Sequence, residues 1–440
     1  MSTFNLDSQV PPGKTRATED SPLRADAPVS ENAADRIDRA WPVLLGAGLC
    51  MFCGQPAVVL FTFGTFVREI VASTNWSPVE LAAAIAPATI LASMLAPFVG
   101  RFADKIGIRR LALIGGPAFA LGFGLLGSLS VSSTTFIALL AITCGLGFAA
   151  TPLLYAQLAT GWFARRRGLA LSLIFACSSL GVVFWSPFAI QLIGLYGWRT
   201  AYAVMGLCAG TIISLSALLL LRDPPRSARA GSAGQAPGLT LSEAMRRATF
   251  WKILAIFFLI TGTLAGTTVN LPVILQKIDI PAQTAAMAVS VAGLAMLIGR
   301  LSAGLLLDRW FAPRVTCLSV VLPLLAFATL LFDQSRSTFI IAAMLVGFGL
   351  GAELDAAAYI VSRGFGLRAF GAIYGMVTLS YGLASAIGPG AMGVAFGASV
   401  APRLIFSISI GLLLTALVLL LTIRADHLPY GATLSDDARN

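Results

Sequence analysis

The feature that most constrains this chain is a series of twelve apolar segments, each long enough to cross a lipid bilayer as an α-helix. Such a helix needs about 20 residues at a rise of about 1.5 Å per residue. Charged residues make up 11% of the chain, against about 25% in soluble proteins. A water-soluble fold is therefore excluded, and we expect an all-α integral membrane protein that contacts the lipid bilayer. The segments comprise residues 42–67, 81–99, 111–130, 136–160, 169–194, 200–221, 253–276, 284–306, 315–332, 338–362, 370–395 and 404–423.

Polar stretches divide these segments into two groups of six. The longest internal stretch follows the sixth segment, and within it Thr240 and Glu243 have the spacing of a capping box. This pattern predicts a short surface helix before the seventh span. We predict five regions: a disordered N-terminal tail at 1–40, a six-helix bundle at 41–221, a central loop at 222–250, a second six-helix bundle at 251–424 and a C-terminal tail at 425–440.

The distribution of basic residues predicts the orientation in the membrane. Cytoplasmic loops of membrane proteins carry an excess of Lys and Arg. With a cytoplasmic N-terminus, 24 of the 30 basic residues fall in the tails and cytoplasmic loops and 5 in the outer loops. We therefore expect both termini in the cytoplasm, and we interpret the net charge of +10 as a topology signal rather than a nucleic-acid-binding surface. The ratio of 26 Arg to 4 Lys favours a bacterium with a GC-rich genome, and hence the bacterial inner (plasma) membrane.

An internal repeat relates the two groups of spans. A shift of 204 residues places Gly100 on Gly304 and Asp104 on Asp308, and it lays spans two to six over spans eight to twelve. Two parallel halves of six helices are typical of one large class of transporters.

Several motifs resemble those of a known family. GRFADKIGIRR (100–110) resembles the signature loop of the major facilitator superfamily, and GRLSAGLLLDRW (299–310) is similar to its counterpart in the second half. The resemblance implies twelve transmembrane helices in two parallel six-helix pseudo-repeats (the major facilitator fold), and transport by alternating access rather than an enzymatic reaction. Three further motifs resemble the monocarboxylate-porter and oxalate:formate-antiporter branch: GWFARRRGLALS (161–172), GWRTAYAVMG (197–206) and AIGPG (386–390).

In this family the signature loop stabilises one of the two access states. A glycine lets two helices approach closely, an aspartate accepts hydrogen bonds at a helix end, and arginines remain near the lipid headgroups. By this resemblance we expect gating residues in both loops: Gly100, Asp104, Gly107, Arg109 and Arg110 in the first, and Gly304 and Asp308 in the second.

Three charged residues lie inside the twelve segments, Arg300 in the eighth and Glu353 and Asp355 in the tenth. A charge at the centre of a membrane helix costs roughly 2.5–3.5 kcal/mol, which favours a functional role. The helical rise places all three about 12–15 Å from the cytoplasmic ends of their spans. Glu353 and Asp355 are two positions apart, so their side chains point about 200° apart around the helix. One acid is therefore expected to face Arg300 or the cavity, and the other a neighbouring helix.

The branch resemblance implies that Arg300 binds a substrate carboxylate, and we expect Glu353 or Asp355 to carry a proton. Guanidinium binds a planar carboxylate through paired hydrogen bonds. The alternative is a closed arginine–acid pair that only joins helices eight and ten. Six polar residues are candidates for hydrogen bonds across the cavity, or for bonds between helices: Gln55, Tyr155, Gln157, Asn270, Tyr374 and Tyr381.

These features predict a proton-coupled secondary transporter, a monomer whose substrate is a small organic anion such as a monocarboxylate. Spans one and eleven contain no charge, so the second cation expected for a dianion is missing. The alternative is a proton-driven exporter of neutral or cationic amphiphiles. We expect no enzymatic activity, cofactor or metal, because the sequence has no nucleotide motif, metal cluster or nucleophile–base pair. The single histidine, His427, falls in the polar tail.

Overall fold

The structure is a computed structural model that describes residues 31–74, 76–77, 81, 84–163, 166–224, 238–277, 282–397 and 401–423. It has two units, Met1–Arg39 and Ala40–Asn440, and every contact described below lies within the second. The C-terminal tail and part of the central loop lie outside the described residues. Helix α1 begins at Glu31, so residues 31–40 correct the expectation of a disordered tail up to 40. Alanine and arginine, which recur in this stretch, favour a helix.

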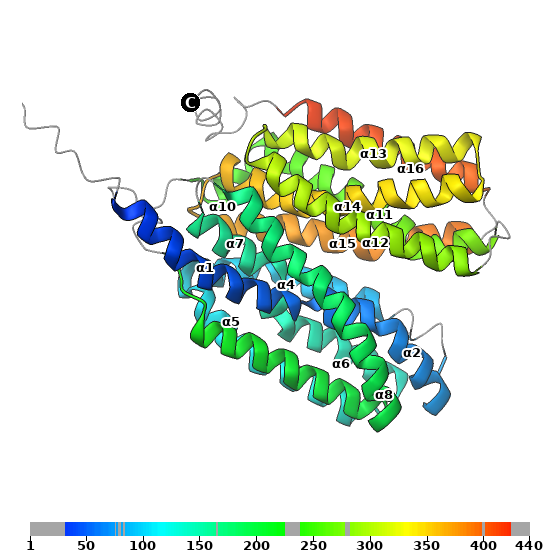
Figure 1. Cartoon of the computed structure of the whole chain (residues 1–440), viewed down its shortest axis with the longest axis horizontal. Helices are drawn as coiled ribbons and strands as arrows, with labels where there is room; N and C mark the ends of the chain where they lie inside the picture. The colour runs from blue at the N-terminus through cyan, green and yellow to red at the C-terminus, as the bar shows by residue number, and fades with distance from the viewer. Residues whose placement is uncertain are drawn as a thin grey trace, which may run out of the picture. The chain divides into compact units, whose positions relative to one another are not determined.

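The described residues of the first half form helices joined by short connections (Figure 1). In chain order they are α1 (Glu31–Phe52), η1 (Pro56–Leu60), α2 (Phe61–Thr74), α4 (Ile85–Ile106), α5 (Ile108–Leu129), α6 (Ser133–Leu146), η2 (Gly147–Ala150), α7 (Pro152–Trp162) and α8 (Arg167–Leu219).

The second half repeats this helical organisation. Its helices are α10 (Leu241–Met245), α11 (Ala248–Lys277), α12 (Ala282–Leu307), α13 (Ala312–Phe332), α14 (Arg336–Gly364), α15 (Phe370–Gly397) and α16 (Pro402–Leu421). The short helix α10 confirms the expected capping box, because the Thr240 side chain accepts from Glu243 N and the Glu243 side chain accepts from Thr240 N.

The twelve predicted spans are confirmed. Eleven described segments are long and apolar enough to cross a membrane. The longest, Arg167–Leu219, contains two spans, because Gly197 leaves the helical conformation at φ 76° and ψ 166°. Local signals start several of these helices: Ser132 and Ser335 cap α6 and α14, and proline occupies the first turn of α7, α13 and α16.

Two spans of the first half are interrupted, which the sequence analysis did not predict. Span one changes from α1 to η1 at Cys53 and Gly54, and span four changes from α6 to α7 through the 3₁₀ helix η2. Proline follows both interruptions, at Pro56 and Pro152. Each interruption frees backbone carbonyl groups that need new partners inside the membrane.

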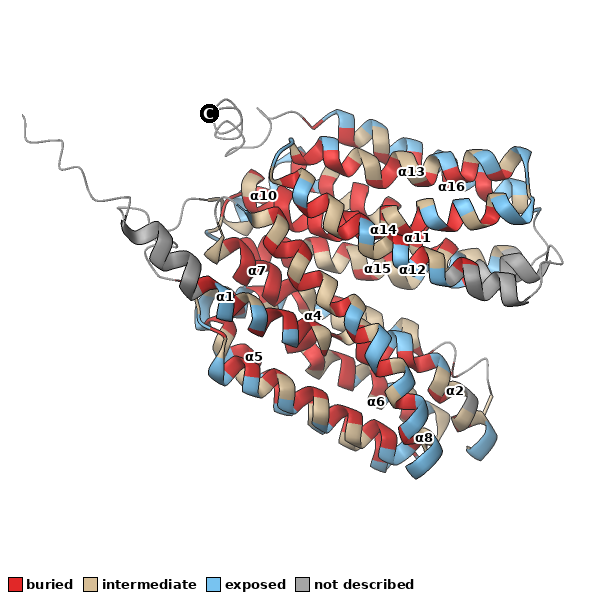
Figure 2. Cartoon of the chain, viewed as in Figure 1, coloured by how far each residue is buried: buried red, intermediate tan, exposed pale blue. Residues whose placement is uncertain are grey.

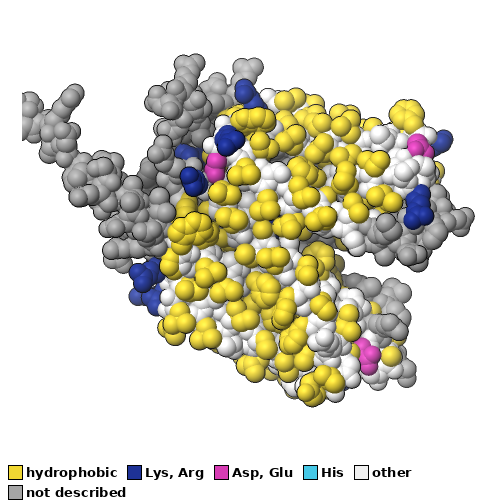
Figure 3. Space-filling view, in the orientation of Figure 1, with side chains coloured by type: hydrophobic (Ala, Val, Ile, Leu, Met, Phe, Trp, Pro, Cys, Tyr) yellow, Lys and Arg dark blue, Asp and Glu magenta, His cyan; other side chains and the backbone are white. Residues whose placement is uncertain are grey.

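The distribution of side chains suits a protein surrounded by lipid. Buried residues line the surfaces where helices face one another, and exposed residues follow their outer surfaces (Figure 2). In the face drawn in Figure 3, hydrophobic side chains cover the middle of the helices and the charged side chains lie towards their ends. Large exposed hydrophobic residues such as Val183, Leu195 and Phe332 would be costly in water but are favourable against hydrocarbon.

Two close helix crossings join the halves, and both use glycine. At the first, α4 meets α15, and a Cβ added to Gly100 would lie 1.9 Å from Gly371 O. At the second, α12 meets α8, and a Cβ added to Gly168 would lie 2.4 Å from Gly304 O. No side chain fits between these backbones, so the four glycines allow the halves to touch. We call the end of the bundle that carries these crossings and residues 100–110, 222–224 and 307–314 the basic end.

Candidate functional site

The three charged residues of the spans lie close together inside the bundle. Arg300 on α12 is 7% exposed, and Glu353 and Asp355 on α14 are 0% exposed. Arg300 Nε lies 3.7 Å from Asp355 Oδ1, which is an ion pair between helices of the same half. Neither atom has a hydrogen bond to a described residue. The pair is therefore looser than a bidentate arginine–carboxylate pair, whose two N–H···O bonds are about 2.7–2.9 Å long.

Helix α8 of the first half contributes two further partners to this pair. Ser172 Oγ donates a hydrogen bond of 2.5 Å to Asp355 Oδ2. Arg300 Nη1 donates a hydrogen bond of 2.7 Å to the backbone carbonyl of Phe175, and its guanidinium carbon lies 5.8 Å from the centre of the Phe175 ring. The positive and the negative member of the pair are thus each bound to α8.

Glu353 is bound differently. It accepts a hydrogen bond of 3.2 Å from Thr261 Oγ1 on α11, a helix of its own half. The structure therefore confirms that the two acids diverge, with Asp355 facing Arg300 and α8, and Glu353 facing α11. The Tyr374 and Tyr381 side chains of α15 lie near this group, since both interact electrostatically with Arg300. We call Arg300, Asp355, Glu353, Ser172 and Thr261 the charged layer.

The other predicted polar residues lie elsewhere and bind backbone carbonyls. Gln55 Nε2 donates to Cys144 O at 2.5 Å, and Tyr155 Oη donates to Ala149 O at 2.5 Å. These carbonyls lie at or beside the interruption of span four. In span one, Trp185 Nε1 donates to the free Phe52 carbonyl at 3.0 Å. Gln55 and Tyr155 thus satisfy backbone groups of the first half in this structure, and their predicted contact with substrate stays a prediction.

Asn270 also binds backbone. Its Nδ2 donates to Gly266 O on α11 at 2.8 Å and to Pro389 O on α15 at 3.0 Å, and it therefore joins two helices of the second half. Its predicted contact with substrate is likewise untested by this geometry.

The first signature loop closes the basic end at the α4–α15 crossing. Asp104 Oδ1 and Oδ2 accept from the backbone N–H groups of Gly371 and Ala372, each at 3.2 Å, at the start of α15. Gln157 Nε2 also donates to Asp104 Oδ1 at 2.6 Å. A carboxylate at a helix N-terminus is favourable because it binds free N–H groups and faces the positive end of the helix dipole.

The rest of this loop packs within the first half. Gly107 has φ 99°, and a Cβ there would lie 2.5 Å from Asp223 Oδ2. Asp223 in turn accepts from Ile108 N at 2.6 Å and so caps α5. Arg109 donates to the carbonyls of Ala217 and Leu218 near the C-terminal end of α8, where a cation is favourable. Arg110 is exposed.

The second signature loop makes the equivalent contact at the α12–α8 crossing. Asp308 Oδ1 accepts from Gly168 N at 2.7 Å and Oδ2 accepts from Leu169 N at 3.0 Å, at the start of α8. Burial raises the pKa of the Asp308 carboxyl above its ordinary value, more than these N–H groups and the nearby Arg363 and Arg166 lower it. Both signature loops therefore bind the opposite half at the same end.

Sequence reasoning missed Ser172, Phe175 and Thr261. No charge or motif distinguishes them, since a serine, a threonine and a backbone carbonyl are common in membrane helices. The resemblance of GWFARRRGLALS includes Ser172 as its last residue, but gives it no role.

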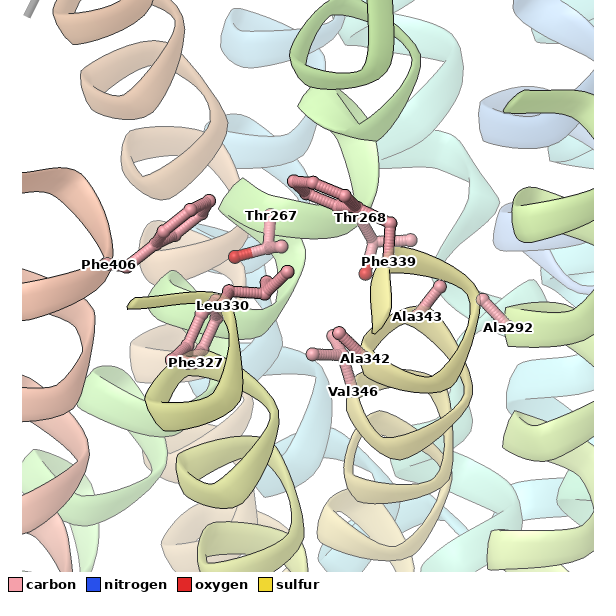
Figure 4. A pocket seen from close by; sticks show the side chains of 10 residues that line it. All are labelled: Thr267, Thr268, Ala292, Phe327, Leu330, Phe339, Ala342, Ala343, Val346 and Phe406. Atoms are coloured by element: carbon pink, nitrogen blue, oxygen red, sulfur yellow. The ribbon is translucent and has the colours of Figure 1, made fainter. Parts of the chain in front are cut away.

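The described residues show no group of three or more His, Cys, Asp or Glu side chains placed to hold a metal ion. A small cavity lies among α11, α12, α13, α14 and α16 (Figure 4). The hydroxyls of Thr267 and Thr268 there donate to carbonyls of their own helix. The cavity has no charged residue in its lining, so it differs from the charged layer. Its other lining residues are Ala292, Phe327, Leu330, Phe339, Ala342, Ala343, Val346 and Phe406.

Comparison with known proteins places these features in a family. Residues 45–389 match the family model of the Major Facilitator Superfamily. YhjX of Escherichia coli (strain K12), described as an uncharacterized MFS-type transporter, is 26% identical over 354 residues, which cover 78% of this chain and 85% of YhjX. Monocarboxylate transporter 13 of Rattus norvegicus is 25% identical over 296 residues, 67% of this chain and 68% of that protein.

Solved structures share the fold. The crystal structure of a bacterial homologue of the iron transporter ferroportin, in an outward-facing state, superposes with a TM-score of 0.69 at 14% identity, and covers 87% of this chain and 98% of that one. At this identity the likeness concerns the fold alone.

Proposed function

Because the chain belongs to the major facilitator superfamily and is a multi-pass membrane transporter of small molecules, we propose that it carries a monocarboxylate together with a proton. The motifs of the monocarboxylate-porter branch and the similarity to monocarboxylate transporter 13 support this substrate class. The arrangement of the charged layer supports the chemistry, as follows.

The observation that carries the proposal is the bonding of Arg300. Its guanidinium is nearly buried, yet it has one hydrogen bond to a backbone carbonyl and a loose ion pair at 3.7 Å. A purely structural pair is expected to close to bidentate geometry, since a buried charge is costly unless it is fully hydrogen-bonded. A substrate carboxylate offers the guanidinium the two parallel bonds that Asp355 does not make here.

Charge balance explains why a proton would accompany the carboxylate. Arg300, ionised Asp355 and a protonated Glu353 together have no net charge. A monocarboxylate on Arg300 adds one negative charge in a medium where an uncompensated charge is expensive. One proton on Asp355 restores neutrality. Uptake of one proton with each monocarboxylate therefore keeps the layer neutral throughout the cycle.

The proposed setting is the plasma membrane, with the basic end in the cytoplasm as the excess of Lys and Arg favours. Because Asp104 and Asp308 both bind the opposite half at the basic end, the proposed state is closed towards the cytoplasm. The protein is proposed to act as a monomer, without a cofactor.

Binding to purified protein tests the substrate class. We would measure the binding of acetate, L-lactate, oxalate and an amphiphilic amine by calorimetry, for wild type, Arg300→Lys, Arg300→Ala and the control Arg403→Ala. Arg403 is an exposed arginine at the other end of the bundle. We expect a monocarboxylate to bind, and both Arg300 variants to weaken it about tenfold or more, since a hydrogen bond to a charged group contributes about 1.5–3 kcal/mol.

Arg300→Lys is informative because it keeps the charge and loses the planar pair of donors. Unchanged carboxylate binding in a folded Arg300→Ala protein would refute the proposal. Amine binding by wild type and by Arg300→Ala, without carboxylate binding, would support an exporter of amphiphiles instead.

A further inference from the structure

Two hydrogen bonds of the charged layer cross from one half of the protein to the other. Ser172 and Phe175 are three residues apart on α8, so both lie on one face of that helix. Ser172 binds Asp355 on α14, and the Phe175 carbonyl binds Arg300 on α12. Helix α8 belongs to the first half, and α12 and α14 belong to the second. Both residues of the ion pair, Arg300 and Asp355, are therefore hydrogen-bonded to the same helix of the opposite half, α8.

The crossing beside this contact is at the basic end. A Cβ on Gly304 would lie 2.2 Å from Ser172 Oγ, so Ser172 is part of the α12–α8 crossing as well as of the charged layer. Opening of the basic end separates α8 from α12 and α14. Both hydrogen bonds must break during that movement.

Glu353 provides an internal contrast. Its partner Thr261 lies on α11 of the same half, so its hydrogen bond can persist when the halves separate. The two neighbouring acids thus differ in one respect that matters for transport. Of the hydrogen bonds made by the two acids, the one made by Asp355 depends on the distance between the halves, and the one made by Glu353 does not.

We propose that Ser172 is a positioning residue of the transport site: with the Phe175 carbonyl it forms a clamp on the Arg300–Asp355 pair that keeps the basic end closed until a substrate carboxylate takes over Arg300. This proposal rests on the proposed function for the identity of the ligand. The clamp itself rests on the hydrogen bonds of Ser172 and Arg300 to their partners in the other half.

Competition for the guanidinium explains the release. A carboxylate bound through two parallel N–H donors takes donors that otherwise serve the Phe175 carbonyl and face Asp355. The contact between α12 and α8 then loses its hydrogen bond. Asp355 loses its counter-ion, and a proton on it keeps the layer neutral. Asp355, rather than Glu353, is therefore the acid whose proton accompanies the movement.

The experiment measures the opening of the basic end by thiol labelling. Leu307, the last residue of α12, is 1% exposed and lies against Gly168 of α8. In a protein with its six native cysteines replaced by alanine, Leu307→Cys would react with a maleimide only when α8 and α12 separate. The labelling rate therefore follows the open-to-closed ratio even when the open state is rare.

Ser172→Ala in this background should raise the labelling rate about tenfold without any ligand, because a hydrogen bond to an ionised group is lost between the halves. Thr261→Ala is the matched control. It removes the hydroxyl that binds the neighbouring buried acid, but within one half, and should leave the rate unchanged. Acetate or L-lactate, whichever binds, should raise the rate of the Ser172-containing protein.

Equal rates for Ser172→Ala and the parent would overturn the clamp, and so would an equal increase in Thr261→Ala, which would indicate general loosening. A carboxylate that binds but leaves the rate unchanged would overturn its release by substrate. Because the Ser172→Ala comparison needs no ligand, its result is independent of whether any carboxylate binds. Failure of the clamp and failure of the proposed function are therefore distinguishable.

Discussion

The two crossings at the basic end are built alike and differ one layer deeper. In each, a glycine pair lets two backbones touch, Gly100 with Gly371 and Gly304 with Gly168. In each, an aspartate caps the first turn of the helix from the opposite half. The shift that relates the signature loops is 204 residues, and the one that relates the capped turns, 168 to 371, is 203.

The residues next to each crossing, further from the basic end, differ between the two halves of the repeat. Ser172, Arg300 and Asp355 lie beside the α12–α8 crossing. The same shifts lead to Gly375, Ala96 and Thr151, and at the α4–α15 crossing a Cβ on Gly375 would lie 2.8 Å from Ala96 O. Next to the first crossing, α4 and α15 make further close backbone contacts. Next to the second crossing, the contacts are instead the Arg300–Asp355 ion pair and its hydrogen bonds. Packing has no group that a ligand can exchange, which is why we assign ligand sensitivity to the second crossing.

The largest effect is expected from adding a methyl group to a crossing. A Cβ on Gly100 would lie 1.9 Å from a backbone oxygen, whereas a Cβ on Gly304 first meets the rotatable Ser172 hydroxyl at 2.2 Å. Gly100→Ala should therefore favour the open state more than Gly304→Ala, by about 1–3 kcal/mol or more. Distances between spin labels at the exposed positions Arg222 and Arg314 would measure the open fraction. A stronger effect of Gly304→Ala would reverse the ranking of the crossings.

An intermediate effect is expected from neutralising the capping aspartates. Asp104→Asn and Asp308→Asn each lose a charge-assisted cap, which costs about 1–2 kcal/mol of closure. Asp308→Asn should cost less, because burial disfavours the ionised Asp308 carboxylate more than the nearby N–H groups, Arg363 and Arg166 favour it. The same label pair measures both variants and the double variant. If the double variant opens the basic end far more than the sum of the singles, the crossings act as one unit rather than as two independent contacts.

The smallest effect concerns the proton of Asp308. Since burial raises its pKa, this carboxyl keeps its proton to a higher pH in the closed crossing than in water. The protonated Asp308 carboxyl therefore stabilises the closed state fully at pH values below its ordinary pKa. This stabilisation declines as the pH rises through the raised pKa. The label distances, titrated across the acidic range, should show this pH dependence in wild type and Asp104→Asn. If the label distances of Asp308→Asn show the same pH dependence, that dependence arises from another titratable group.

Sequence patterns predicted the framework because membrane helices follow simple rules. Length and hydropathy predicted twelve spans, and the spacing of Thr240 and Glu243 predicted the cap of α10. Helical rise alone brought Arg300 and Asp355 to a similar depth, and the structure places them 3.7 Å apart. Depth along a helix is a one-dimensional quantity, which a sequence contains directly.

The partners could not be predicted in the same way, because they depend on how each helix is rotated and which helix it faces. Ser172 and Thr261 come from α8 and α11, far from α14 in sequence. The interruptions of spans one and four had a weak signal in Pro56 and Pro152, which follow glycine-containing stretches. Each proline marks a break in its span, and backbone carbonyls at or beside the break in span four bind Gln55 and Tyr155.

The bonds between the halves share a property with consequences for genetic analysis. Asp104 and Asp308 bind main-chain N–H groups of the opposite half, and Arg300 binds the carbonyl of Phe175. Every residue type except proline offers the same main-chain donor, and every type offers the same acceptor. Substitution at Ala372, Leu169 or Phe175 keeps the main-chain donor or acceptor, so a mutational scan would not reveal these three partners. Gly371 and Gly168 differ, because a side chain at either would meet the backbone of the opposite half. Ser172 makes its bond through its side chain, so such a scan can detect it.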